Sequence, residues 1–300
     1  MKKKLAKGIK KLAHAPFGKM LKVINDIIAV AQVIVLKFIW YLSGKKKTTS
    51  EEVKNVCENV TFIYKSFERQ KMAKRLYKSI QSYYPGARVI IADDSAKPLE
   101  LTGENLEIIQ LPFNSGLSVG LNRALERVTT PFVVRMDDDQ LLTPFTRTEK
   151  QLAFLKEHAE VDLVGILLNH LPKYRSIKKE AEGYYKQSMN YAPKKLLIPH
   201  LTKIDETHIV VGKSPNTFVA RTDKIKEIGY DDNIRMIDHN EFFYRAAGNI
   251  VSVLDKTAFV LHFRNWFDTR YNQYRSDYHG DVVYIREKMR NSIKSQNERE

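Results

Sequence analysis

Between residues 60 and 168, short runs of β-branched and aromatic residues alternate with longer stretches that repeat apolar residues at helical spacing. Five runs have the composition of buried strands, at 60–64, 88–92, 106–111, 131–136 and 161–168. Three stretches have the spacing of amphipathic helices, at 68–84, 116–128 and 144–158. Strands that alternate with helices predict an α/β fold, with a parallel sheet covered by helices on both faces.

Acidic residues follow two of these strands directly. Asp93 and Asp94 end the second strand, and Asp137, Asp138 and Asp139 end the fourth. Ligands of open α/β sheets bind at the carboxyl ends of strands, and oxygen ligands with open positions suit Mg²⁺ or Mn²⁺ bridging phosphates. On an extended backbone the first and third aspartates would point one way and Asp138 another. An acidic surface turn is the alternative, which the second acidic pair at the same edge makes less favourable.

The net charge of +15 is concentrated at the N-terminus. Residues 1–47 contain twelve lysines, no arginine and one acid, Asp26, so they carry +11 and the other 253 residues carry +4. A folded nucleic-acid-binding face would spread over the globule and use arginine as well, so the charge favours an anionic lipid surface instead. One cysteine, Cys57, excludes an intramolecular disulfide framework and a cysteine-cluster zinc site.

Residues 1–47 predict two membrane-associating helices. Residues 1–20 form a basic amphipathic pattern, and residues 21–43 are apolar and long enough to span a bilayer. Five polar residues of the second stretch fall within an arc of about 140°: Lys22, Asn25, Asp26, Gln32 and Lys37. This segregation predicts a helix lying in the membrane interface; a signal-anchor span and a core or partner-binding helix are the alternatives. We see no small-residue cleavage site, so a removable signal peptide is not expected.

Several motifs, in order along the chain, resemble family 2 glycosyltransferases. They cover about residues 60–262 and include TFIYKSFER at 61–69, YYP at 83–85, IIADDS at 90–95, NSGLS at 114–118, TPF at 130–132, MDDD at 136–139, NTFVAR at 216–221, DHNEFFYR at 238–245 and VLH at 260–262. The likeness is greatest to the β-1,4-N-acetylgalactosaminyltransferase branch, which includes the GM2/GD2 synthases.

The resemblance implies a GT-A fold, a Rossmann-like mixed sheet with helices on both faces, that uses a UDP-sugar and Mn²⁺ or Mg²⁺ and inverts the anomeric centre. It also assigns donor-site roles to individual residues. Ser66, Glu68, Asp93 and Asp94 would line the uridine pocket. Asn114 and Gly116 would approach the nucleotide, and Asp137 would meet ribose or sugar. Asp139 and His262 would bind the metal. Gly116 lacks a Cβ and opens a helix, which suits close phosphate approach.

The general base is left open by the sequence. In the wider family an acidic pair precedes the arginine that corresponds to Arg245, and here the pair reads Asp238-His239, with histidine in the aspartate position. Glu241 is favoured slightly over His239, with a helix N-terminal charge as its alternative role. His262 could also be an ordinary core residue. The histidines at 158, 170, 200, 208 and 279 are interpreted as surface or structural.

We therefore predict a basic membrane-associating segment at 1–47, a linker at 48–59, a glycosyltransferase domain at 60–285 and a charged tail at 286–300. The expected reaction transfers an N-acetylhexosamine such as GalNAc from UDP to a glycan or glycolipid, in surface polysaccharide synthesis. The alternative is a catalytically inactive nucleotide- or glycan-binding relative. The expected location is the cytoplasmic face of a bacterial inner membrane, or else a single-pass signal anchor.

Three further expectations concern the remaining segments. The tyrosine-rich stretch at 173–199 is expected to be an acceptor-side insertion. The aromatic stretch at 264–284 is expected to be a lid or C-terminal cover. Because every proposed site residue lies after Val60, deletion of residues 1–47 is expected to leave a soluble, active protein.

Overall fold

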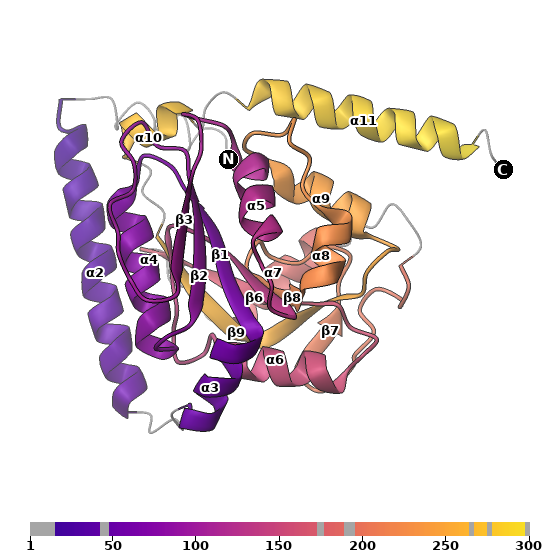
Figure 1. The fold of residues 1–300 in the computed structure, drawn as a ribbon, viewed down its shortest axis with the longest axis horizontal. Coiled ribbons are helices and arrows are strands. Elements are labelled where there is room, and N and C mark those ends of the chain that lie inside the picture. The colour runs from indigo at the N-terminus through magenta and orange to yellow at the C-terminus, as the bar shows by residue number, and fades with distance from the viewer. Residues whose placement is uncertain are drawn as a thin grey trace.

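A computed structural model of the chain describes residues 16–42, 48–172, 177–188, 196–263, 267–274 and 278–297. Most of the amphipathic helix expected at 1–20 lies outside these residues, as do Tyr174, Tyr191 and Trp266. Figure 1 shows one central sheet flanked by helices, with α2 along one side and α11 across one end.

The core of the sheet is parallel. Strands β3 (Leu106–Gln110), β2 (Arg88–Asp93), β1 (Val60–Ser66) and β4 (Phe132–Asp137) lie side by side in that order. They pair in parallel, with Ile63 opposite Ile90 and Arg135 in the flanking strands. Their carboxyl ends therefore lie at one edge, as the alternation of strands and helices predicts.

Beyond β4 the sheet becomes mixed. Strand β8 (Phe218–Arg221) is antiparallel to β4 and to β6 (Leu163–Leu171). Strand β9 (Ser252–Phe263) runs parallel to β6 and pairs antiparallel with β5 (Gln140–Leu141) and β7 (His208–Val210). The α/β class is confirmed, and the sheet is mixed, as the resemblance implies.

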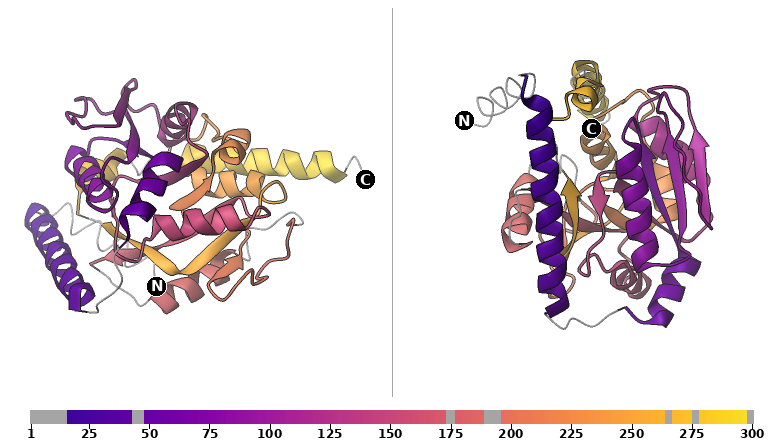
Figure 2. Two further views of the ribbon diagram at one scale, coloured as in Figure 1. Left: turned by 60° about the horizontal axis from the view of Figure 1, so that its bottom comes forward. Right: turned by 90° about the vertical axis from the view of Figure 1, so that its left-hand side faces the viewer.

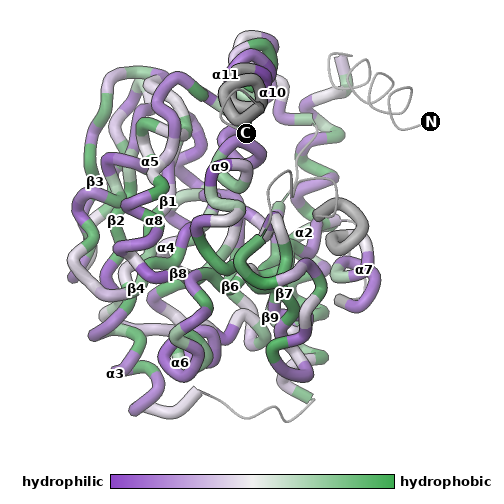
Figure 3. The backbone as a smooth tube through the Cα atoms, turned by 90° about the vertical axis from the view of Figure 1, so that its right-hand side faces the viewer, coloured by the Kyte–Doolittle hydropathy of each residue, from purple (hydrophilic) through white to green (hydrophobic). Residues whose placement is uncertain are grey.

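Side chains of alternate residues build the two cores on either side of the sheet, because successive strand residues point to opposite faces. On one face, Phe62 and Tyr64 pack with helices α3 (Ser50–Asn59), α4 (Gln70–Tyr83) and α6 (Thr148–Glu157). On the other face, Ile63 packs with α5 (Leu117–Glu126), α8 (Thr222–Ile228) and α9 (Asp238–Ala246). Figure 3 shows hydrophobic residues concentrated around β6 and β7.

A third cluster joins helix α2 (Gly18–Leu42) to the body. Its Ala29 and Trp40 are buried with Phe145, Phe259 and residues of β6, near α7 (Ile177–Ser188). The Trp40 ring makes edge contacts with Phe145 and Phe259, at centroid distances of 5.6 and 6.1 Å. Figure 2 shows α2 running along the full height of the body.

Two segments differ from the expected linker and tail. Residues 50–59 form helix α3, which Thr49 and Glu52 start with a reciprocal capping box. Helix α11 (His279–Asn297) continues through most of the segment expected to be a charged tail. The short helix α10 (Thr269–Tyr274) lies beyond the end of β9, at the same end of the molecule as α11 (Figure 1).

Candidate functional site

The predicted acidic clusters meet at the carboxyl edge of the parallel strands. Ser66 and Asp93 are register partners at the ends of β1 and β2, and Lys65 is the register partner of Asp137 at the end of β4. Parallel pairing brings these strand ends together because all three strands run in one direction. The structure thus places both clusters at one site.

Asp138 and Asp139 share one partner, Arg69, in the loop between β1 and α4. The Arg69 guanidinium donates to Asp138 and to Asp139 Oδ2, the latter at 2.9 Å, and stacks on the Tyr271 ring at 3.7 Å. The expected alternation of the three aspartates is wrong, because β4 ends at Asp137 and the next two residues form a turn. Burial raises the pKa of Asp138 above its ordinary value, against the opposing effect of Arg69.

The other carboxylate oxygen of Asp139 faces His262. The Nε2 atom of His262 lies 3.2 Å from Asp139 Oδ1, and its Nδ1 atom lies 2.7 Å from Nδ1 of His170. A backbone hydrogen bond also joins the two segments, since the Phe263 N–H donates to the Asp139 carbonyl at 2.8 Å. The structure therefore brings together the two residues that the resemblance names as metal ligands, 123 positions apart in the sequence.

The donor set at this point fits a divalent cation. Two ligands at right angles, each about 2.1 Å from an octahedral ion, lie about 3 Å apart, which is close to the separation of Asp139 Oδ1 and His262 Nε2. One carboxylate and one imidazole are a combination that Mn²⁺ accepts. Within the described part of the chain, no cluster of three or more His, Cys, Asp or Glu is arranged to hold a metal by itself. The remaining positions would thus be taken by substrate oxygens or water.

Asp137 belongs to a separate ion-pair chain. Arg135, only 1% exposed, donates to Asp137 Oδ1 at 2.7 Å, and its other terminal nitrogen lies 3.7 Å from Asp238 Oδ2. Asp137 and Asp238 therefore flank one buried guanidinium. Arg135 also donates to the carbonyl of Asn216 at 2.7 Å, which fixes its position under the sheet edge.

Asp93 and its neighbours organise the loop after β2. The Asp93 carboxylate accepts from Ser95 Oγ at 2.7 Å and from the Leu99 N–H at 2.8 Å. The Glu68 N–H donates to Ser95 Oγ at 2.7 Å, and Glu68 Oε1 accepts from the Ala96 N–H at 2.9 Å. These contacts join the ends of β1 and β2. Their role in binding a nucleotide stays a prediction.

The buried hydroxyl of Ser66 offers a binding group at the same edge. Among the described residues, Ser66 Oγ has no hydrogen-bond partner. A buried polar group without a partner is uncommon and suggests that a ligand or water completes it. This observation fits the uridine-pocket role predicted for Ser66.

Asp94 ties the loop at residues 114–116 to the strand edge. Its carboxylate pairs with Lys65 Nζ at 2.6 Å and accepts from the Gly116 N–H at 3.1 Å. The Leu117 N–H donates to the Arg235 carbonyl at 2.7 Å. These two N–H groups at the start of α5 therefore already have partners in the structure. Gly116 instead allows close packing, since a Cβ there would lie 3.2 Å from Cα of Arg235 at a φ of +108°.

A pocket of about 250 Å³ opens beside this loop. It is lined by Asn114, Arg235, Met236, Gln273 and Tyr274, so it lies between the 114–116 loop, the segment before α9, and α10. The expectation of an aromatic cover at 264–284 fits this position of α10.

Aromatic rings join α10 to the site edge. Tyr274 contacts Phe67 and Phe113, at centroid distances of 5.1 and 6.0 Å. Together with Tyr271 on Arg69, these contacts place α10 over the loops that follow β1 and β3.

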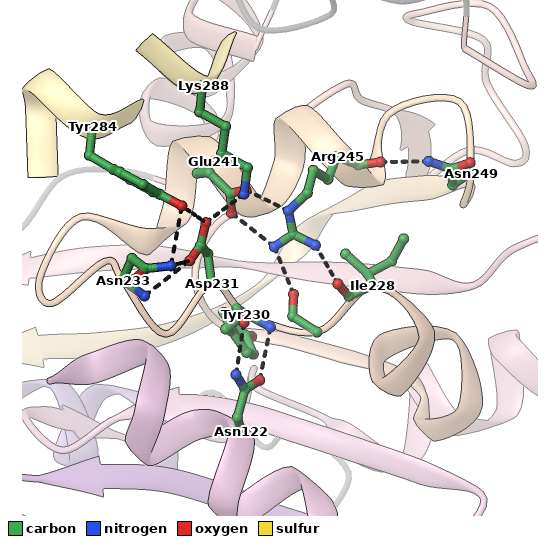
Figure 4. A network of polar contacts seen from close by, with 11 residues as sticks. Asn122, Ile228, Tyr230, Asp231, Asn233, Glu241, Arg245, Asn249, Tyr284 and Lys288 are labelled. Carbon is green, nitrogen blue, oxygen red and sulfur yellow. Dashed lines mark hydrogen bonds and ion pairs between the residues drawn. The ribbon is translucent and has the colours of Figure 1, made fainter. Parts of the chain in front are cut away.

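Glu241 lies in a structural network, which Figure 4 shows. Its carboxylate accepts from Arg245 at 2.5 and 2.8 Å and from Lys288 of α11 at 2.6 Å. Lys288 also donates to Asp231 at 2.5 Å, and Tyr284 Oη donates to Asp231 at 2.9 Å. Both oxygens of buried Glu241 are therefore engaged, which disfavours the sequence preference for this residue as base.

His239 and Lys213 lie near Asp238. Burial, followed by the positive charges of Lys213 and Arg135, holds the pKa of His239 well below its usual range, so its imidazole is neutral at physiological pH. Burial lowers the pKa of Lys213 to about 8, although Asp238 opposes this shift, and Lys213 Nζ donates to Asn240 at 2.5 Å. Asp238 thus lies among several cationic or neutral groups.

Sequence reasoning missed four residues of this region. Arg69 and Arg135 carry no distinguishing local pattern, and their partners become visible only when the strand ends meet. His170 was interpreted as surface or structural, whereas its ring contacts His262. Asp281 of α11 accepts from the N–H groups of residues 235–237 at 3.2, 2.8 and 3.3 Å, which holds the segment entering α9.

The fold is that of the GT-A class of nucleotide-sugar transferases, as solved structures confirm. GalNAc-T7, solved with UDP, GalNAc and Mn²⁺, matches with a TM-score of 0.53 at 11% identity, over 70% of this chain and 44% of that one. TarS of S. aureus (residues 1–349) matches with a TM-score of 0.51 at 18% identity, over 68% and 60%.

The sequence comparisons give the family. The model of "Glycosyl transferase family 2" matches residues 61–214, and the chain belongs to this family. β-1,4 N-acetylgalactosaminyltransferase 1 of Rattus norvegicus is 31% identical over 206 residues, which are 65% of this chain and 37% of that protein. β-1,4 N-acetylgalactosaminyltransferase 2 of Mus musculus is 32% identical over 195 residues, or 64% and 37%. The chain thus spans little more than a third of the length of these curated relatives.

Proposed function

We propose that the chain is an inverting, metal-dependent glycosyltransferase that moves an N-acetylhexosamine from a UDP-sugar to a glycan or glycolipid hydroxyl. The main observation behind this proposal is that Asp139 Oδ1 and His262 Nε2 lie 3.2 Å apart at the carboxyl edge of the strands, in a chain of glycosyltransferase family 2. A cation bound there would neutralise charge that develops on the departing diphosphate.

The similar proteins support the donor class. Two relatives are named N-acetylgalactosaminyltransferases, and TarS has been solved with UDP and with UDP-GlcNAc. In this chain Asp139 and His262 would hold the cation, Ser66 and the 93–95 loop would line the uridine pocket, and Asp137 would meet ribose or sugar. Residues 60–285 would form the catalytic domain, with acceptor recognition near the 173–199 segment.

We assign proton removal to the Asp238–His239 pair instead of Glu241. Asp238 shares Arg135 with Asp137, so it lies toward the donor edge, whereas Glu241 is held by Arg245 and Lys288. Within the pair, Asp238 is the favoured proton acceptor, because the burial and the positive charges that lower the pKa of His239 make its protonated form unfavourable. Glu241→Gln should mainly lower stability and leave kcat of the folded protein nearly unchanged, whereas Asp238→Asn and His239→Gln should lower kcat of the folded protein beyond any loss of stability. Equal kcat in all three variants would contradict this assignment.

A donor screen tests the reaction. UDP release is measured for the full chain with UDP-GalNAc, UDP-GlcNAc, UDP-Glc and UDP-Gal, with Mn²⁺, with Mg²⁺ and with a chelator. We expect one N-acetylhexosamine donor to be favoured and turnover to need the metal. Asp139→Asn, which removes a charge from the proposed cation site, should lose turnover. Asp223→Asn, in α8 away from the strand edge, is its control and should keep turnover. Binding of UDP without turnover of any donor would instead support the inactive, nucleotide-binding relative, which the histidine at position 239 favours.

We also propose that the outward face of α2 lies in a membrane interface. Gly18–Leu42 is long and apolar enough to cross a bilayer. Its polar Lys22 pairs with Asp268 at 2.7 Å, and Gln32 donates to the Pro172 carbonyl at 2.8 Å, so these polar residues face the body. The large apolar residues that α2 leaves exposed are Met20, Val23, Ile24, Ile27, Ile28, Val30, Ile34, Val35, Phe38, Ile39, Tyr41 and Leu42.

The docking of α2 favours an in-plane position over a membrane span. Contacts to the body occur near both ends of the helix, at Lys22 and at Trp40. A helix of 25 residues is about 37 Å long, so crossing the bilayer in this arrangement would take the polar body into the hydrocarbon. The lysines of residues 1–47 would add attraction to anionic lipid on the cytoplasmic face.

A further inference from the structure

His170 and His262 face each other across neighbouring parallel strands. The two residues are register partners in β6 and β9, and their rings cross at 61° with centroids 4.8 Å apart. Their Nδ1 atoms are 2.7 Å apart, which is a hydrogen-bond distance. A hydrogen bond between the two Nδ1 atoms fixes the rotation of each ring about its Cβ–Cγ bond, because a flipped ring would place a carbon at that position.

This contact decides which atom of His262 faces Asp139. With Nδ1 directed to His170, the Nε2 atom of His262 points to Asp139 Oδ1 at 3.2 Å. A half-turn of the ring would instead place a carbon near the carboxylate. We propose that His170 is a positioning residue, which holds the His262 imidazole so that Nε2 is presented beside Asp139 to a divalent cation. This inference rests on the proposed function.

The hydrogen bond also determines the tautomers. A metal-binding Nε2 must be unprotonated, so neutral His262 then carries its proton on Nδ1. That N–H donates to Nδ1 of His170. This Nδ1 is therefore unprotonated, so neutral His170 carries its proton on Nε2. Each ring thus carries one N–H proton, and both rings are neutral. An outer partner that fixes a ligand's tautomer typically contributes 10- to 100-fold to metal affinity, in order of magnitude.

Metal binding to the full-length protein tests this assignment without requiring turnover. Mn²⁺ is titrated by electron paramagnetic resonance in the presence of saturating UDP. The variants are His170→Phe, which keeps a ring without polar atoms, and His170→Gln, whose amide oxygen can still accept from His262. His279→Phe, an exposed position on α11, is the matched control. We expect His170→Phe to weaken Mn²⁺ binding about 10- to 100-fold, and His170→Gln and His279→Phe to stay near wild type.

A spectroscopic measurement keeps the assignment testable if a variant fails to fold. In ¹⁵N-labelled wild-type protein with UDP and diamagnetic Mg²⁺, His262 should carry its proton on Nδ1, in a hydrogen bond. A His262 protonated on Nε2, or unchanged Mn²⁺ affinity in His170→Phe, would overturn the proposal. Mn²⁺ binding that depends on His170 without turnover of any donor would overturn the proposed function only.

Discussion

At the scale of single residues, the candidate site is a set of carboxylates that differ in their partners. Asp137 is held by Arg135, Asp138 by Arg69, and Asp139 by Arg69 and His262. Their successive positions in the sequence therefore correspond to three different environments. Substitutions at adjacent aspartates should separate binding chemistry from structural support.

Asp139→Ala should abolish most activity, because it removes a carboxylate from the proposed cation site. Loss of such electrostatic stabilisation typically costs at least about a hundredfold in kcat. Asp138→Ala should retain more activity but lose about 2 kcal/mol of stability, since it removes buried Asp138's charged hydrogen bond to the half-buried Arg69. Steady-state kinetics and chemical denaturation measure the two effects. Equal losses of kcat at both positions would contradict this division.

The pH dependence of stability should show the buried amine of Lys213. Its pKa is about 8 in the folded chain and about 10.4 when unfolded. Between these values the unfolded chain binds more protons, so this group makes the free energy of unfolding rise with pH, by about 2–3 kcal/mol over the window. Lys213→Met should remove that rise, so the free energy of unfolding of the variant relative to wild type should be higher at pH 7 than at pH 10.5. Parallel denaturation curves for both proteins from pH 7 to 10.5 would refute the shift.

At the scale of elements, the two outer helices have different relations to the catalytic body. Helix α11 holds the entry to α9 through Asp281 and contacts Glu241 through Lys288. Helix α2 contributes Trp40 to a core cluster and exposes the opposite face. The expectation that residues 1–47 can be deleted cleanly therefore needs revision, since deletion would uncover Phe145 and Phe259.

Trp40 and Phe38 of α2 form a matched pair of aromatic substitutions. Trp40 is 8% exposed and Phe38 is 62% exposed. Trp40→Ala should cost about 3 kcal/mol of stability and increase tryptic cleavage in α2, because a buried indole leaves a cavity. Phe38→Ala should change stability by less than about 0.5 kcal/mol but weaken vesicle binding. Similar stability losses in both variants would mean that α2 docks differently.

At the scale of the whole molecule, the most basic part of the sequence is the N-terminal segment that includes the apolar helix α2. The body beyond residue 47 carries only +4, whereas the first 47 residues carry +11. In the sequence, this charge and the exposed apolar residues of α2 all precede the proposed site residues, which begin at Ser66. This arrangement allows attachment and catalysis to be tested separately.

Full-length protein should bind vesicles of anionic lipid through both charge and apolar burial. Each lysine near the surface contributes roughly 1 kcal/mol, and salt screens that attraction over about 8 Å. Binding in a flotation assay should therefore weaken at high salt without disappearing. Alkaline carbonate should extract the protein, because the docked α2 lies in the interface. Resistance to carbonate would show a span and contradict the in-plane position.

The sequence by itself determined the order of strands and helices between residues 60 and 168, the parallel part of the sheet and the acidic ends of β2 and β4. These features follow from local patterns, since apolar periodicity and strand-end position are written in neighbouring residues. The resemblance added His262 as the partner of Asp139, and the structure brings these two together. Local patterns also anticipated the polar stripe of α2, although not that Lys22 and Gln32 within it contact the body.

Only the tertiary structure decided which residues share a partner. Arg69, Arg135 and His170 gained their roles from chain segments far away in the sequence, and no local pattern encodes such pairings. The turn after Asp137 overrode strand alternation, and α11 engaged Glu241 in a network that its helix position did not suggest. The burial of Trp40 likewise follows from packing against β9. Long-range contacts such as these form only when the sheet brings its strand ends together.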